Sequence, residues 1–119
     1  MVLLGAAAGG VARYGIGLAV LHRYGGRFPW GTVIVNITGC LLIGVLMTLF
    51  TERWTEHPHW RLFLVTGGLG GFTTFSSFEW ETYEAVATGN PWSGLANVLL
   101  SVVAGYAAVV LGALLARRG

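Results

Sequence analysis

Residues 70–79 read GGFTTFSSFE and interrupt a hydrophobic segment that is long enough to be a membrane helix. Glycines and a cluster of hydroxyl side chains stand here among apolar residues. Backbone that leaves the helix inside a bilayer exposes unpaired N–H and C=O groups. Such a break is tolerated only where it is buried in protein or lines a polar pathway. The stretch therefore predicts a broken membrane helix whose break carries the function.

The composition around this stretch is that of a membrane protein. The chain has 119 residues, of which 55% are hydrophobic and 10% are charged, and its mean hydropathy is +0.69. Soluble domains carry about 25% charged residues. We therefore expect an all-α protein that lies in a lipid bilayer.

Four hydrophobic segments predict a single four-helix transmembrane domain that covers residues 1–119. The spans are expected at 2–21, 31–51, 60–87 and 92–116, and the third is expected to break near 70–74. Segments of this length cross a hydrocarbon core of about 30 Å.

The break itself predicts two half-helices that meet near the middle of the membrane. The first half is expected to end in the glycines of 67–71, and the second to begin with the capping-box spacing Ser76-x-x-Glu79. Carbonyl groups at the end of the first half suit a cation, and N–H groups at the start of the second suit an anion. A plain kink is the alternative, but a kink needs only one glycine.

Phe75 and Phe78 lie three residues apart and therefore share a face of the second half-helix. Two interpretations stay open. On spacing alone the commoner one is that the rings pack in the core or face lipid. In the other, their positive ring edges help to hold a small anion.

Neutral polar side chains recur in the second and fourth spans, at Asn36 and at Asn97 and Ser101. Asn36 is either an interhelical hydrogen bond, worth on the order of 1 kcal/mol in membranes, or a donor that lines a pathway. Together with the hydroxyls of the third span, these residues supply neutral donors from three helices.

Several classes of function are excluded by what the sequence lacks. All seven basic residues are arginine, so lysine chemistry and a lysine-rich nucleic-acid surface are absent. No aspartate is present, and Cys40 is the single cysteine. No catalytic constellation can be assembled, so we expect neither an enzyme nor a nucleic-acid partner.

The arginines give only a weak charge bias across the membrane. Four would lie on one side and two on the other, with Arg13 inside its span: Arg53, Arg61, Arg117 and Arg118 against Arg23 and Arg27. Such a chain either inserts in both orientations and pairs as an antiparallel homodimer, or keeps one orientation. Charge alone favours neither.

These motifs resemble those of the fluoride channel family known as Fluc or CrcB. The most specific is GGFTTFSSF at 70–78, supported by GTVIVNITG at 31–39 and GGVARY at 9–14. The resemblance covers essentially all four spans. It implies a fluoride-selective channel that passively exports fluoride from the cytoplasm across the plasma (inner) membrane of a prokaryote.

The resemblance also implies an architecture, which is a dual-topology, antiparallel homodimer with two fluoride pores and a central structural sodium ion. The carbonyl groups of Gly70 and Thr73 would hold the sodium ion. The side chains that it assigns to the fluoride pore are Asn36, Phe75, Phe78, Glu81 and Ser101, and the hydroxyls of Thr74 and Ser77 at the break are expected to line the pore as well. Gly105 and Val109 depart from the family, because relatives carry further hydroxyls there.

Two other functions are the alternatives to a fluoride channel. A small dual-topology, proton-coupled multidrug antiporter shares the size and the weak charge bias, but such carriers need an ionisable pathway residue, and the first span offers only Arg13. A non-conducting assembly subunit would give the broken span no use.

Overall fold

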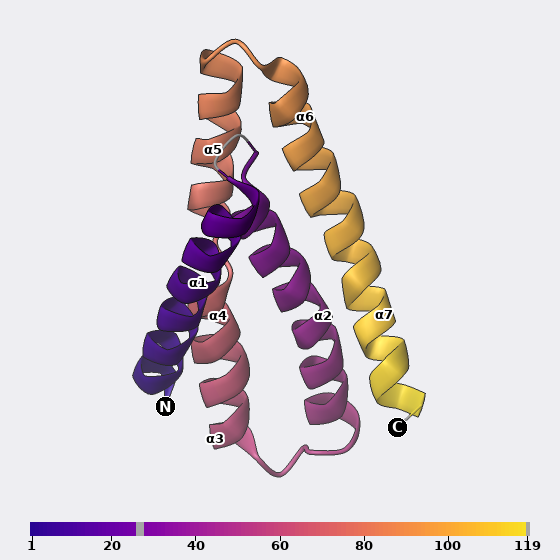
Figure 1. The fold of residues 1–119 in the computed structure, drawn as a ribbon. Helices are drawn as coiled ribbons and strands as arrows, with labels where there is room; N and C mark the ends of the chain where they lie inside the picture. Colours follow the sequence, from indigo (N-terminus) through magenta and orange to yellow (C-terminus); the bar gives the residue numbers. More distant parts are fainter. Residues whose placement is uncertain (26–27, 119) are drawn as a thin grey trace.

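The computed structural model describes residues 1–25 and 28–118, and within these ranges it contains helices and no strand (Figure 1). The predicted all-α class is confirmed. Arg27, which entered the charge count, lies outside the described residues.

The helices form four successive segments, one at each expected span. The first two are α1 (Val2–Tyr24) and α2 (Trp30–Glu52). The third consists of α3 (Pro58–Arg61), η1 (Leu62–Leu69) and α4 (Gly70–Phe72), followed after a break by α5 (Phe75–Ala87). The fourth runs through α6 (Pro91–Leu99), η2 (Leu100–Ala104) and α7 (Gly105–Arg118). α1, α2 and the continuous segment Pro91–Arg118 are each long and apolar enough to cross a membrane.

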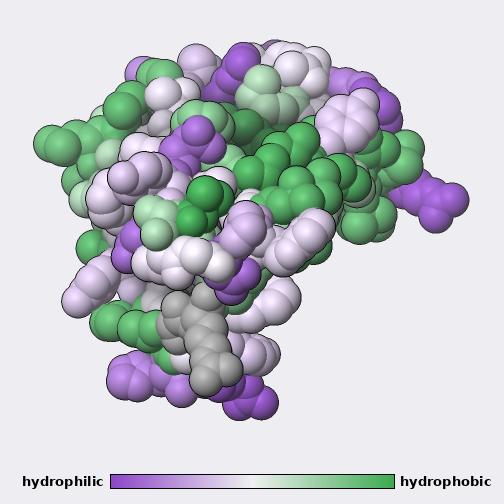
Figure 2. All heavy atoms as spheres, turned by 90° about the horizontal axis from the view of Figure 1, so that it is seen from above, coloured by the Kyte–Doolittle hydropathy of each residue, from purple (hydrophilic) through white to green (hydrophobic). Residues whose placement is uncertain are grey.

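The break divides the third span between two neighbours (Figure 1). Its first half, η1 and α4, packs against α1, whereas its second half, α5, packs against α6. α2 packs along α7 and completes the bundle. Broad hydrophobic areas separate scattered hydrophilic residues when the molecule is seen from its α5–α6 end (Figure 2). Many large apolar side chains along the helices are exposed, which suits a surface in contact with lipid.

Glycines bring α1 and the first half of the third span into backbone contact. A Cβ atom on Gly9 would overlap the carbonyl oxygen of Gly68, and one on Gly71 would lie 2.6 Å from the carbonyl oxygen of Ala6. Gly44 and Gly112 bring α2 and α7 together in the same way. These small residues therefore serve close packing within the chain.

The break lies at Thr73 and Thr74, which are the two extended residues between α4 and α5. Their φ/ψ angles are −91°/156° and −149°/122°. The break lies within the expected 70–74, but the first half ends later than expected, since Gly70 is still helical with φ −61° and ψ −39°. Gly67 and Gly71 are needed for the close approach of α1, whereas β-branched threonines suit an extended backbone.

The start of the second half-helix also differs from the expectation. Thr74 is the N-cap of α5, and its Oγ1 accepts a hydrogen bond from the Ser77 backbone N–H at 3.3 Å. The predicted capping box at Ser76 and Glu79 is therefore wrong. Ser76 already lies inside the helix, so its hydroxyl cannot cap the first free N–H groups.

Candidate functional site

Asn36 on α2 satisfies the backbone at the break. Its Nδ2 donates to the Thr74 carbonyl oxygen at 3.3 Å, and its Oδ1 accepts from the Thr74 N–H at 3.1 Å. Thr74 is extended and so has lost its helical partners. Of the two interpretations of Asn36, this structure contains the interhelical hydrogen bond. One N–H of the amide is left over, because the NH₂ group carries two donors.

A groove of about 500 Å³ beside the break, which we call the phenylalanine groove, collects most of the predicted site. It is lined by residues from α2, both halves of the third span and η2. The predicted residues among them are Asn36, Gly70, Thr73, Thr74, Phe75, Phe78 and Ser101. Only the chain's tertiary arrangement brings these residues together, and it leaves Ser77 and Glu81 elsewhere.

The two phenylalanines differ in their surroundings. Phe78 is 6% exposed and Phe75 is 74% exposed, although their ring centroids lie 5.8 Å apart. Phe78 is thus held by the chain's own packing, while Phe75 projects from it. Ser101 Oγ is buried and has no hydrogen-bond partner among the described residues. The groove is therefore lined by two aromatic rings and a hydroxyl without a partner.

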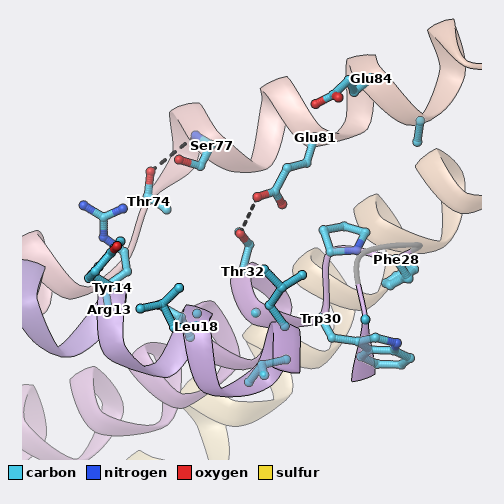
Figure 3. A pocket seen from close by; sticks show the side chains of 18 of the residues that line it. Arg13, Tyr14, Leu18, Phe28, Trp30, Thr32, Thr74, Ser77, Glu81 and Glu84 are labelled. Carbon is cyan, nitrogen blue, oxygen red and sulfur yellow. Dashed lines mark hydrogen bonds between the residues drawn. The ribbon is translucent and has the colours of Figure 1, made fainter. Parts of the chain in front are cut away.

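Ser77 and Glu81 line a second groove of about 570 Å³, which we call the glutamate groove (Figure 3). Thr32 Oγ1 donates to Glu81 Oε1 across this groove at 2.7 Å, and Glu81 Oε2 is buried without a partner in the described chain. Thr74 lines both grooves, so the break lies between them.

Arg13, whose facing the sequence left open, also lines the glutamate groove (Figure 3). Its Nε donates to the carbonyl oxygen of Gly71 at 3.1 Å, near the end of the first half-helix. A charge inside a membrane span is costly and usually has a partner. That rule signals the existence of a partner for Arg13, but sequence alone does not identify it.

The residues expected to hold sodium satisfy a simple test of fit. Among the hydrogen bonds found between described residues, none ends on the carbonyl oxygen of Gly70 or Thr73. Gly70 is exposed and has open space around it. Carbonyl oxygens without partners at a helix end suit a hard cation. The donor set therefore fits sodium.

Comparison with known proteins gives consistent matches. The family described as CrcB-like protein, Camphor Resistance (CrcB), matches residues 1–113. A protein of Solibacter usitatus named fluoride-specific ion channel FluC is 62% identical over 118 residues, which cover 99% of this chain and 97% of the relative. Proteins of the same name from Chloroflexus aurantiacus and Coxiella burnetii are 47% and 45% identical. They cover 98% and 99% of this chain, and 92% and 96% of their own lengths are matched.

Proposed function

Because this chain belongs to the CrcB family, we propose that it is a fluoride-selective ion channel that conducts passively. The match to the family model and to the relatives confirms the resemblance inferred from its motifs. The chain is a multi-pass membrane protein and not an enzyme. The matched relatives are bacterial proteins, and we place this one in the plasma membrane, where it would export fluoride from the cytoplasm.

The observation that carries this proposal is the phenylalanine groove. Fluoride is small and strongly hydrated, so a pathway must replace its water with closely placed donors. The free hydroxyl of Ser101 and the remaining N–H of Asn36 are such donors. The edges of Phe75 and Phe78 carry partial positive charge and add to them without a full charge. A larger chloride ion would fit the same row poorly.

The glutamate groove is proposed as the mouth of this pathway. It is lined by Arg13, Ser77 and Glu81, and it shares Thr74 with the phenylalanine groove. Arg13 brings positive charge to a place where an anion would leave water. The hydrogen bond from Thr32 occupies one oxygen of Glu81, which reduces the repulsion that this carboxylate would exert.

A second copy of the chain would close the pathway. The phenylalanine groove is open, and Phe75 is 74% exposed beside it. The weak arginine bias agrees with two oppositely oriented copies, which would give two pores. Sodium, held by the carbonyl groups of Gly70 and Thr73, would supply positive charge that joins the copies. The carbonyl groups of Gly70 and Thr73 would hold the sodium ion in place.

The test is fluoride efflux from liposomes that contain the purified protein. We expect rapid fluoride loss and no chloride loss, measured with ion-selective electrodes against protein-free liposomes. Multidrug antiport would instead appear as drug uptake driven by a proton gradient. Equal fluoride efflux with and without protein would refute the proposal.

A further inference from the structure

Asn97 on α6 is a buried polar side chain that the proposed pathway does not use. It is 0% exposed, and its Nδ2 donates to Thr82 Oγ1 at 3.0 Å. Thr82 Oγ1 in turn donates to the carbonyl oxygen of Phe78 at 2.8 Å. A chain of two hydrogen bonds therefore runs from α6 to α5 and ends on the backbone of a groove phenylalanine.

The same face of α6 is in close contact with α5. Gly94 lies three residues before Asn97, and a Cβ atom on it would lie 3.0 Å from Val86 Cγ2 and 3.4 Å from the Thr82 carbonyl oxygen. α5 packs mainly against α6 and touches α2 little. The rotation of α5 about its own axis therefore depends on this contact with α6, together with the hydrogen bond from Thr32 on α2 to Glu81.

The energetics of Asn97 indicate that it determines orientation. Its Oδ1 is buried and has no partner among the described residues. Burying an amide with an unpaired oxygen costs free energy that a leucine of similar shape would not. An apolar residue would therefore serve packing at least as well, and what the amide adds is a directional bond to Thr82.

We propose that Asn97 is a positioning residue that, through Thr82, sets the direction in which Phe78 and Phe75 face the phenylalanine groove. This inference rests on the proposed function for its effect on transport. Functional groups must be held to within about 0.5 Å and 10–20°. A rotation of α5 would move both rings together, because they share one face of that helix.

The first experiment removes the hydroxyl that joins the two helices. Thr82→Val keeps the shape but not the hydrogen bonds, and Thr82→Ser keeps them. We expect Thr82→Val to slow fluoride efflux about tenfold at equal protein, because the free energy of one buried hydrogen bond corresponds to a factor of about ten. The efflux of Thr82→Ser should stay near that of the parent. Thr51→Val is the matched control, since Thr51 Oγ1 also bonds the carbonyl oxygen four residues earlier, at 2.8 Å, but lies exposed at the end of α2.

A double variant separates positioning from stability. Thr82→Val alone strands the Asn97 amide, whereas Thr82→Val with Asn97→Leu removes both partners and should recover most of the lost thermal stability. We expect its fluoride efflux to stay low. Recovery of efflux together with stability would show that the hydrogen bond between Asn97 and Thr82 is merely structural, and it would overturn the inference.

A readout that does not depend on transport completes the test. With 4-fluorophenylalanine at position 78, the ¹⁹F chemical shift should change in Thr82→Val and in the double variant, but not in Thr82→Ser or Thr51→Val. An unchanged shift in all variants overturns the positioning role, whatever the efflux. A parent protein that does not conduct fluoride overturns the proposed function instead, and the ¹⁹F comparison still decides the positioning.

Discussion

The Asn36 side chain and the Thr74 backbone form a closed pair, in which one amide both donates to the Thr74 carbonyl oxygen and accepts from the Thr74 N–H. This is the pairing that a neighbouring strand would give an extended residue. Here a side chain from α2 supplies it, in a bilayer that offers no water. The break is therefore held in place by a specific contact.

Removing that amide should destabilise the break. In Asn36→Leu both backbone groups of Thr74 lose their partner, and we expect a loss of about 1–3 kcal/mol for each group left unpaired in the interior. Asn36→Asp keeps an oxygen for the Thr74 N–H, but it loses the Nδ2 donor and brings an ionisable carboxyl group into the span, so we expect it to destabilise the break as well. Thermal unfolding in detergent measures both variants. Equal stability of Asn36→Leu and the parent would show that water reaches the break.

The positive ring edges of Phe75 and Phe78 should be required for fluoride transport. Phe75→Ile and Phe78→Ile keep bulk but lose the positive ring edge, so we expect each to cut fluoride efflux by more than about tenfold. Methionine is polarisable and flexible and should do less harm. Phe78→Ile should also lower the melting temperature, because Phe78 is buried and Phe75 is exposed. If both isoleucine variants assemble and conduct like the parent, the rings are packing residues.

The contact between α1 and the broken span should be destabilised by the addition of a single methyl group. Gly9→Ala would force Cβ into the Gly68 carbonyl oxygen, and we expect it to cost at least about 1–3 kcal/mol. Gly10→Ala is the matched control, because no atom lies within 4 Å of its new Cβ. Folded yield by size-exclusion chromatography compares them. Similar yields from the two variants would mean that α1 can shift away.

Sodium should stabilise the protein if the carbonyl groups of Gly70 and Thr73 bind it. Replacing sodium with N-methyl-D-glucamine should lower the melting temperature, and adding sodium should restore it as binding linkage requires. Thr73→Ser should retain the response, since the proposed ligand is backbone. A melting temperature independent of sodium would remove the ion from the proposal.

Both orientations should be found in the membrane. In a Cys40→Ala background, single cysteines at the exposed positions Arg23 and Arg118 should each react with impermeant reagent from both sides. The weak arginine bias is the reason. Labelling of each position from one side only would exclude the antiparallel homodimer.

The sequence by itself determined the all-helical membrane fold, because a bilayer leaves few ways to pair the backbone of so hydrophobic a chain. It also located the break to within a few residues, since hydroxyls and glycines inside a span are a local signal. The predicted residues around Phe75 and Phe78 were named from the same stretch and from the family resemblance.

Only the tertiary structure decided which partners meet. The break fell at Thr73 and Thr74, beyond Gly67 and Gly71, which pack against α1. Arg13 bonds to a residue 58 positions away, and Asn36 to one 38 away. Thr82 meets Asn97 because α5 and α6 lie side by side. Such pairs depend on how the helices are rotated and packed against one another, and local sequence patterns contain no record of that rotation.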